Sequence, residues 1–340
     1  MSGRARASYY EGTRRFSTGA VPMPVAGPGE ALLRVLRVGI CGTDLHIFQG
    51  HLDHRVPRRG TIGHETLAQV VEAPAGSGFS AGDRVVVEPV LACRQCRACA
   101  MGATYLCYQL KVMGVDAPGG MQDYWAVPTG HLLTVPPTLS DDEAAVIEPV
   151  AVATHDVRRA GVKAGDVVAV FGGGPIGALV AMVARQRGAR VMVAEVNPFR
   201  TEILRRLGFE TVGAEAVVPI VREWSGGEGV DVAFECSGNP HAVAAMTEVV
   251  RVWGTVSIVA IHSEPIPVNL YALFARELTM HGSRLYARED WEDAIRLAAG
   301  GAVTVGPLVS RKIPLEALQQ GMEDALGGGP VMKVLVDLTA

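Results

Sequence analysis

The feature that most constrains the fold is a regular alternation of strand-like and helix-like patterns between residues 165 and 261. Short valine-rich runs alternate with longer segments in which apolar residues recur every three or four positions. Parallel strands need a crossover between them, which a helix supplies, so this alternation predicts a doubly wound parallel sheet. The segments are GDVVAVF, PIGALVAMVARQRG, ARVMVAEV, FRTEILRRLG, VDVAFEC, HAVAAMTEVVR and GTVSIVAI.

A glycine-rich turn joins the first strand of this alternation to the first helix. Its residues are Gly172, Gly173, Gly174, Pro175, Ile176 and Gly177. An isolated turn of this kind is often only a tight connection. Here it directly follows a strand and opens a helix, where glycines let the backbone approach a pyrophosphate that rests on the helix N-terminal amides. The sequence therefore predicts a dinucleotide-binding turn.

The end of the second strand carries a carboxylate, Glu195. It stands about 20 residues after the glycines, where an acidic residue binds the adenosine ribose of a dinucleotide. A carboxylate at this place favours NAD, because the 2′-phosphate of NADP would bring a like charge against it. Arg200, five residues later, is a further candidate cofactor ligand that would soften this preference if it turned towards a phosphate.

Residues 30–90 have a different sequence pattern, in which short apolar runs are separated by turn residues. Examples are EALLRVLRVGI, ETLAQVVEA and GDRVVVEPV. These runs predict β-strands. A chain of 340 residues exceeds what one hydrophobic core usually supports, so two domains are expected. The helix pattern WEDAIRLAAGG and the strand pattern KVLVDL near the C-terminus are expected to return to the first domain.

Four of the six cysteines lie close together between residues 90 and 110. They are Cys93, Cys96, Cys99 and Cys107. Four thiolates at this spacing can close a tetrahedral shell around zinc and leave no open position, which indicates a structural site. Disulfides are disfavoured in a chain without an export signal, and an iron–sulfur cluster remains an alternative that spacing alone does not exclude.

A second group of potential ligands is spread over the first half of the chain. It comprises Cys41, His64, Glu65 and Glu148. Each residue alone has an ordinary interpretation as a buried thiol, a core histidine or a helix-end carboxylate. One thiolate, one imidazole and one carboxylate together form a three-ligand set that leaves a position for substrate or water, as in catalytic zinc sites.

Charge and hydropathy exclude several kinds of partner. The formal net charge is −4, and no long basic run marks a nucleic-acid or anionic membrane surface. The N-terminus lacks the apolar segment of a signal peptide, and charge or glycine breaks every apolar stretch before it could span a bilayer. We therefore expect a cytoplasmic protein whose partner is a small molecule.

These motifs in this order resemble the zinc-dependent medium-chain dehydrogenase/reductase family over nearly the whole chain. GICGTDLH, GHE, the four-cysteine lobe, IEPVAVATH and FGGGPIG are most similar to its sorbitol, butanediol and threonine dehydrogenase branch. The resemblance implies a GroES-like β-barrel catalytic domain over 1–150, a Rossmann NAD-binding domain over 151–285, and a return to the catalytic domain over 286–340. It also implies a homodimer or homotetramer.

The resemblance further implies two zinc ions per subunit, with catalytic zinc on Cys41 and His64 beside the carboxylates of Glu65 and Glu148. Which carboxylate binds the metal directly is left open. Thr43 and His46 are implied as a relay that carries the substrate proton towards solvent, while Asp44 between them orients a neighbour.

The implied reaction is transfer of a hydride to NAD from the secondary alcohol of a small polar substrate. Candidate substrates are a polyol, a sugar acid, a cyclitol, a diol and a hydroxy amino acid such as L-threonine. Tyr286 and Arg288, after the strand pattern at 278–282, are candidates for binding a polar substrate. The alternatives are a non-catalytic nicotinamide-binding structural or sensor protein and a zinc-free quinone reductase, which would need neither Cys41 nor the cysteine lobe.

Overall fold

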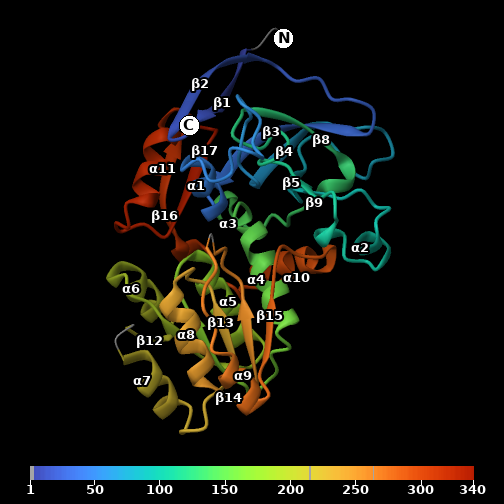
Figure 1. Cartoon of the computed structure of the whole chain (residues 1–340). Coiled ribbons are helices and arrows are strands. Elements are labelled where there is room, and N and C mark those ends of the chain that lie inside the picture. The colour runs from blue at the N-terminus through green and yellow to red at the C-terminus, as the bar shows by residue number, and fades with distance from the viewer. Residues whose placement is uncertain (1–3, 214–215, 263) are drawn as a thin grey trace. The chain divides into compact units, whose positions relative to one another are not determined.

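The computed structural model describes residues 4–213, 216–262 and 264–340, and its contacts divide the chain into two compact units (Figure 1). The first unit comprises Met1–Glu148 and Val309–Ala340, and the second comprises Pro149–Leu308.

The second unit is built on a six-stranded parallel sheet. Its strands are β10 (Val167–Phe171), β11 (Arg190–Ala194), β12 (Glu210–Val212), β13 (Val230–Glu235), β14 (Val250–Ile258) and β15 (Thr279–Gly282). They lie in the order β12-β11-β10-β13-β14-β15, and every neighbouring pair is parallel. The strand order reverses direction between β10 and β13, which is the switch point where Rossmann sheets bind dinucleotides. The predicted doubly wound sheet is confirmed.

Helices precede, connect and follow these strands along the chain. They are α4 (Ile147–Arg159), α5 (Pro175–Gln186), α6 (Pro198–Arg206), α7 (Val217–Trp224), α8 (Pro240–Val249), α9 (Leu270–Arg276) and α10 (Arg288–Ala299). Helices α5, α6 and α8 each begin with proline, whose fixed φ suits the first helical position. The side chains of Asn197 and Asn239 cap α6 and α8 by accepting backbone N–H bonds.

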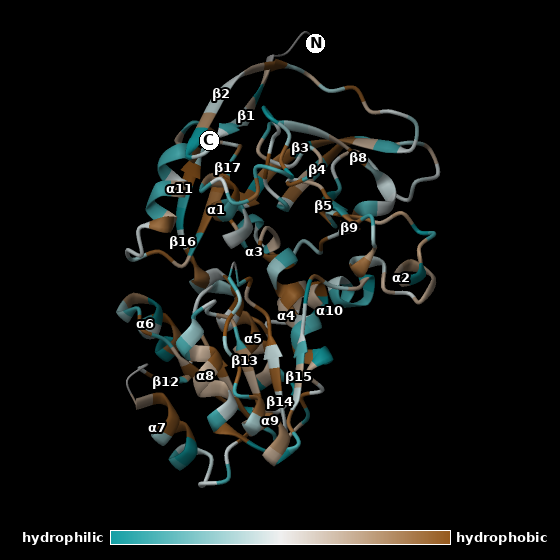
Figure 2. Cartoon of the chain, in the orientation of Figure 1, coloured by the Kyte–Doolittle hydropathy of each residue, from teal (hydrophilic) through white to brown (hydrophobic). Residues whose placement is uncertain are grey.

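The first unit is mainly β-structure. Its strands are β1 (Arg4–Gly12), β2 (Arg15–Pro22), β3 (Glu30–Gly39), β4 (Glu65–Glu72), β5 (Arg84–Val87), β6 (Val90–Leu91), β7 (Lys111–Val112), β8 (Tyr124–Pro128), β9 (Leu132–Thr134), β16 (Val309–Pro314) and β17 (Lys333–Asp337). Its helices are α1 (Gly42–Phe48), α2 (Arg97–Ala100), α3 (Asp141–Ala144) and α11 (Leu318–Leu326). The main sheet has the order β16-β17-β3-β4-β5-β9, with β8 beside β3. Helix α11 of this unit is mostly hydrophilic in colour (Figure 2).

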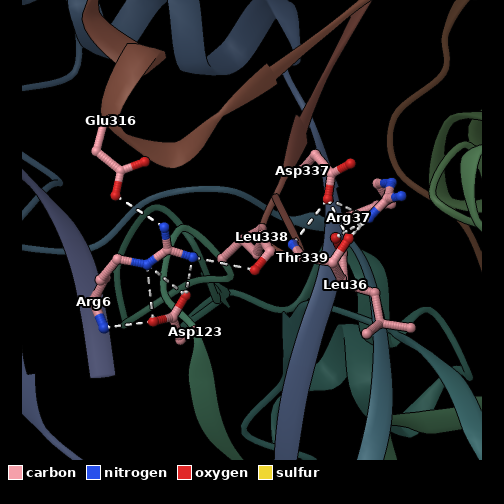
Figure 3. Close-up of polar contacts among 8 residues, drawn as sticks. All are labelled: Arg6, Leu36, Arg37, Asp123, Glu316, Asp337, Leu338 and Thr339. Carbon is pink, nitrogen blue, oxygen red and sulfur yellow. Dashed lines mark hydrogen bonds and ion pairs between the residues drawn. The ribbon is translucent and has the colours of Figure 1, made fainter. Parts of the chain in front are cut away.

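Ion pairs join the C-terminal strand to the N-terminal part of this unit (Figure 3). Strand β17 pairs antiparallel with β3. Arg6 on β1 binds Asp123 at 3.0 Å and Glu316 at 2.9 Å, and donates to the carbonyl of Leu338 at 3.2 Å. Arg37 on β3 pairs with Asp337 at 2.6 Å. The last residues of the chain are therefore an integral part of the first unit.

The C-terminal return begins later than the sequence suggested. We expected residues 286–340 to rejoin the first domain, but 286–308, including α10, lie in the second unit. Asp290 on α10 is buried and binds His155 at 2.9 Å and Arg158 at 2.8 Å, both on α4. A buried carboxylate requires such partners, so α10 stays with α4, and only β16, α11 and β17 return.

Candidate metal and cofactor sites

Strand register brings the candidate catalytic ligands together. In the antiparallel pair β3 and β4, Gly39 lies opposite Glu65. Cys41 follows the end of β3 and His64 precedes the start of β4, so both reach the same end of the pair. One ligand atom each from Cys41, His64 and Glu65 lies within 4.8 Å of the others. This thiolate, imidazole and carboxylate set suits a tetrahedral metal with one position open.

Lys333 holds the carboxylate of Glu65. Its Nζ donates to Glu65 Oε1 at 2.6 Å and to the carbonyl of Ile40 at 3.0 Å, and both side chains are almost completely buried. A Cβ on Gly39 would lie 1.9 Å from Glu65 Oε2, so only glycine leaves space for this carboxylate. The sequence did not point to Lys333, because nothing local links it to a residue some 270 positions earlier.

Asp44 is placed to orient His64. Its Oδ2 accepts the backbone N–H of Cys41 at 2.8 Å, and its Oδ1 faces His64 Nδ1 at 3.7 Å. Burial disfavours the charged imidazole, but Asp44 and Cys41 attract the proton strongly enough to raise the pKa of His64 well above its usual value. A buried set of acidic groups that draws a proton onto its histidine also favours a metal cation, so the residues fit zinc.

Glu148 lies near this group without being part of it. It is 5% exposed at the start of α4. Its negative charge contributes to raising the pKa values of His64 and Lys333. Glu65 is thus the carboxylate that the fold brings into the three-ligand group, while Glu148 adds charge beside it.

The two candidate relay residues lie on α1, which begins directly after Cys41. Thr43 is half-buried in the first turn, and His46 is half-buried one turn later. Burial and the neighbouring His51 lower the pKa of His46. The Nδ1 atoms of His46 and His51 lie 3.1 Å apart, a contact that the sequence pattern did not suggest.

The four-cysteine lobe gathers its sulfur atoms into one cluster. Ligand atoms of Cys93, Cys96, Cys99 and Cys107 all lie within 4.8 Å of one another, and no disulfide joins them. The Sγ atoms of Cys96 and Cys99 are 3.5 Å apart, and those of Cys96 and Cys107 are 3.9 Å apart. Zn–S bonds in a tetrahedron place sulfurs about 3.8 Å apart. Backbone N–H donors from Cys93 and Gln109 to Cys107 Sγ favour its thiolate and lower its pKa.

Replacing Cys93 by serine should lower the Tm by roughly 5–10 °C, because a closed four-thiolate site contributes folding energy when metal binds. Calorimetry and zinc analysis, each with and without a chelator, measure this. Arg97→Ala, an exposed change within the same lobe, is the matched control and should melt as the wild type does. A Cys93→Ser protein with unchanged Tm and zinc content would contradict a stabilising metal site.

The glycine-rich turn has the geometry of a phosphate-binding loop. Gly172 has φ of 97° and Gly174 is the N-cap of α5, with Pro175 at its first position. A Cβ on Gly177 would lie 1.8 Å from the carbonyl oxygen of Gly172, so any side chain there would displace the turn. The free amides at the start of α5 fit the pyrophosphate of a dinucleotide.

Backbone amides surround the carboxylate of Glu195. Its Oε2 accepts the N–H of Gly173 at 2.8 Å, and its Oε1 accepts those of Val196 and Asn197 at 2.7 Å each. The charge of Glu195 is therefore fixed beside the glycine-rich turn. The Arg200 Nη1 atom lies 3.5 Å from where a Cβ of Gly174 would stand, so its guanidinium is over the same turn.

The structure gives Tyr286 a packing position. It is 1% exposed, and its ring meets Trp291 edge-on with centroids 5.2 Å apart. Arg288 is exposed as the first residue of α10. Their suggested role in binding a polar substrate stays a prediction.

Two family models match most of the chain. The model for the alcohol dehydrogenase GroES-like domain matches residues 27–137, and that for zinc-binding dehydrogenases matches 175–300. Within the described residues, no helix is long and apolar enough to cross a membrane.

Individual relatives are similar over almost their full length. The 2-dehydro-3-deoxy-L-galactonate 5-dehydrogenase of Pseudoalteromonas atlantica is 40% identical and covers 98% of this chain and 99% of its own. The L-threonine 3-dehydrogenase of Marinomonas sp. is 31% identical over 93% and 94%. A crystal structure from Sinorhizobium meliloti 1021, assigned as a zinc-binding dehydrogenase and bound to NADP, has a TM-score of 0.92 at 31% identity over 98% and 99%. The chain therefore belongs to the zinc-dependent medium-chain dehydrogenase family.

Proposed function

We propose that this enzyme oxidises a secondary alcohol of a sugar acid with NAD as the hydride acceptor. The observation that carries the proposal is the 40% identity, over 98% of the chain, to a dehydrogenase whose substrate is named as a deoxygalactonate. The clustering of Cys41, His64 and Glu65 supports a catalytic rather than a purely structural role. L-Threonine is the second candidate substrate, because a relative at 31% identity acts on it.

The chain's own residues have distinct roles in this proposal. Cys41, His64 and Glu65 would hold zinc. Lys333 orients Glu65 by a hydrogen bond, and Asp44 faces His64 Nδ1 at 3.7 Å. When bound, zinc would lower the pKa of the substrate hydroxyl, and the nicotinamide would accept the hydride. The Cys93 lobe would hold a second, structural zinc. Thr43 and His46 would move the hydroxyl proton away from the site.

A substrate panel tests the proposal. Purified enzyme with zinc is given sugar acids, neutral polyols, diols and L-threonine, and the formation of NADH is followed by its absorbance. The proposal expects the highest kcat/KM among six-carbon sugar acids. A matching polyol that lacks the carboxylate is the control, since it isolates the contribution of the acid group. Highest kcat/KM with L-threonine would favour the second candidate, and no hydride transfer to any substrate would overturn both.

Preference for NAD over NADP is part of the proposal. The fixed carboxylate of Glu195 would accept hydrogen bonds from ribose hydroxyls and repel a 2′-phosphate. A hydrogen bond to a charged group contributes about 1.5 to 3 kcal/mol, so NADH should bind roughly 10-fold to 100-fold more tightly than NADPH. The NADP-bound relative makes this comparison necessary.

Fluorescence titration of wild type, Glu195→Ala and Arg200→Ala with NADH and NADPH measures this preference. Glu195→Ala should reduce the ratio of the two affinities, while Arg200→Ala, which removes a cation over the same turn, serves as the comparison. If Arg200→Ala weakens NADPH binding alone, the guanidinium faces the 2′-phosphate. Equal affinities of the wild type for both cofactors would refute the assignment of Glu195.

From the resemblance to the family we also expect a cytoplasmic location and a homodimer or homotetramer. Size-exclusion chromatography with light scattering measures the oligomer. A monomer at micromolar concentration would contradict that expectation.

A further inference from the structure

Two histidines face each other at the C-terminal end of α1. The Nδ1 atoms of His46 and His51 lie 3.1 Å apart, and the ring centroids are 5.5 Å apart at an interplanar angle of 43°. The backbone N–H of His51 donates to the carbonyl of His46 at 3.0 Å, so the turn that ends the helix holds the rings together. His46 is half-buried and His51 is exposed, which gives the pair an inner and an outer member.

The short contact links the tautomers of the two rings. At this distance one nitrogen must carry a hydrogen and the other must offer a lone pair, because two N–H groups or two lone pairs would repel. When His46 donates from Nδ1, its Nε2 is free to accept a proton. When His51 donates instead, His46 carries its hydrogen on Nε2 and is ready to give it up.

The electrostatic surroundings favour release of a proton from His46. Its pKa is lowered by burial first and by the charge of His51 second. Helix α11 packs against α1 and carries Glu323, and Arg14 donates its backbone N–H to Phe48 of α1. Neither of these charges is among the causes of the shift. Asp53, in the turn after His51, instead accepts the hydroxyl of Tyr10 at 2.5 Å.

We propose that His51 is a positioning residue that takes up a proton from His46 Nδ1 as the substrate proton reaches His46 Nε2, and that it releases its own Nε2 proton to solvent. This inference rests on the proposed dehydrogenase reaction, in which His46 takes up that proton. An N–H bond forms at His46 Nε2 while the Nδ1–H of His46 passes to His51 Nδ1, and the Nε2–H of His51 leaves to water or buffer. One proton enters and one leaves, without any electron transfer. Exchange of protons with water at both rings restores the starting tautomers.

His51→Gln tests the role in catalysis, with His54→Gln as the matched control. His54 is an exposed histidine three residues further along the same turn, outside the pair. Rates of alcohol oxidation are measured from about pH 6 to pH 9 at low and high buffer concentration. Loss of His51 should lower kcat about 10-fold at low buffer and low pH, with little change in KM. Added imidazole should restore the rate, because a mobile base replaces the missing acceptor.

An NMR titration of the histidine rings provides a test that does not depend on turnover. In His51→Gln the pKa of His46 should rise, since the neighbouring charge that lowers it is gone. His54→Gln should leave the titration of His46 as in the wild type.

The outcomes separate this inference from the proposed function. A wild type that oxidises alcohols while His51→Gln keeps full kcat at low buffer overturns the relay. A kcat loss that imidazole does not restore, or an unchanged His46 titration, also overturns it. If the wild-type enzyme oxidises no alcohol, the proposed function is contradicted. The relay is then overturned as well, whatever the histidine titration shows, because it has no reaction to serve.

Discussion

Replacing His64 by alanine should lower kcat/KM by at least about 10³-fold while leaving NADH binding largely intact. A Lewis-acid metal stabilises the reacting oxygen by several kcal/mol, and each 1.4 kcal/mol corresponds to a factor of ten in rate. His64 lies within 4.8 Å of the ligand atoms of Cys41 and Glu65, so its loss would open the three-ligand group. Cys41→Ala should have the same effect for the same reason.

Turnover, zinc content and NADH fluorescence are measured on each variant. His131→Ala is the matched control, because His131 is a half-buried histidine of the same unit that contacts the carbonyl of Glu88 at 3.0 Å. The control should keep both metals and near-normal turnover. His64→Ala should lose about one zinc per subunit and retain that of the cysteine lobe. Wild-type activity in His64→Ala or Cys41→Ala would remove this group from catalysis.

The second large effect concerns Asp156, a fully buried carboxyl on α4. Both of its oxygens lack a hydrogen-bond partner among the described residues. Burial raises the pKa of Asp156 to about 7 from an ordinary value of 3.8; the nearby hydroxyl of Ser283 lowers this pKa in part, and the negative charge of Asp290 raises it further. The folded state thus binds a proton that the unfolded state has released. The contribution of this group to the free energy of unfolding is fully present below about pH 3.8 and falls as pH rises to about 7, by up to about 4 kcal/mol in total. Above that pH it no longer changes.

Asp156→Asn should abolish this dependence, because the amide resembles the protonated acid and does not ionise. The Tm is measured from about pH 4 to about pH 8.5, with Asp293→Asn, a change at a half-buried carboxylate on α10, as control. Unpaired amide donors would cost about 1–3 kcal/mol at every pH, so the difference in pH slope is the informative quantity. Parallel curves for wild type and Asp156→Asn would show that Asp156 does not titrate in this range.

Local sequence patterns were sufficient for much of the fold and for the composition of each candidate site. The alternating apolar segments predicted the parallel sheet, and the strand before Gly172 together with the helix after Gly177 predicted the dinucleotide-binding turn. The spacing of the lobe cysteines was enough to expect one cluster of sulfurs. These features depend on residues within one or two elements of each other, where periodicity and spacing carry the information.

Contacts between residues far apart in the chain depend on how the strands and helices pack. Pairing of β17 with β3 brings Lys333 to Glu65, and Asp290 binds α4, which keeps α10 in the second unit. The sequence patterns also did not predict that backbone amides bind the carboxylate of Glu195, or that a turn places His51 against His46. Buried polar groups must find partners, but their identity depends on strand register and helix docking, which no local periodicity encodes. Local patterns in the sequence therefore indicate which kinds of site are present, whereas packing of the chain fixes the residues that hold each candidate ligand in place.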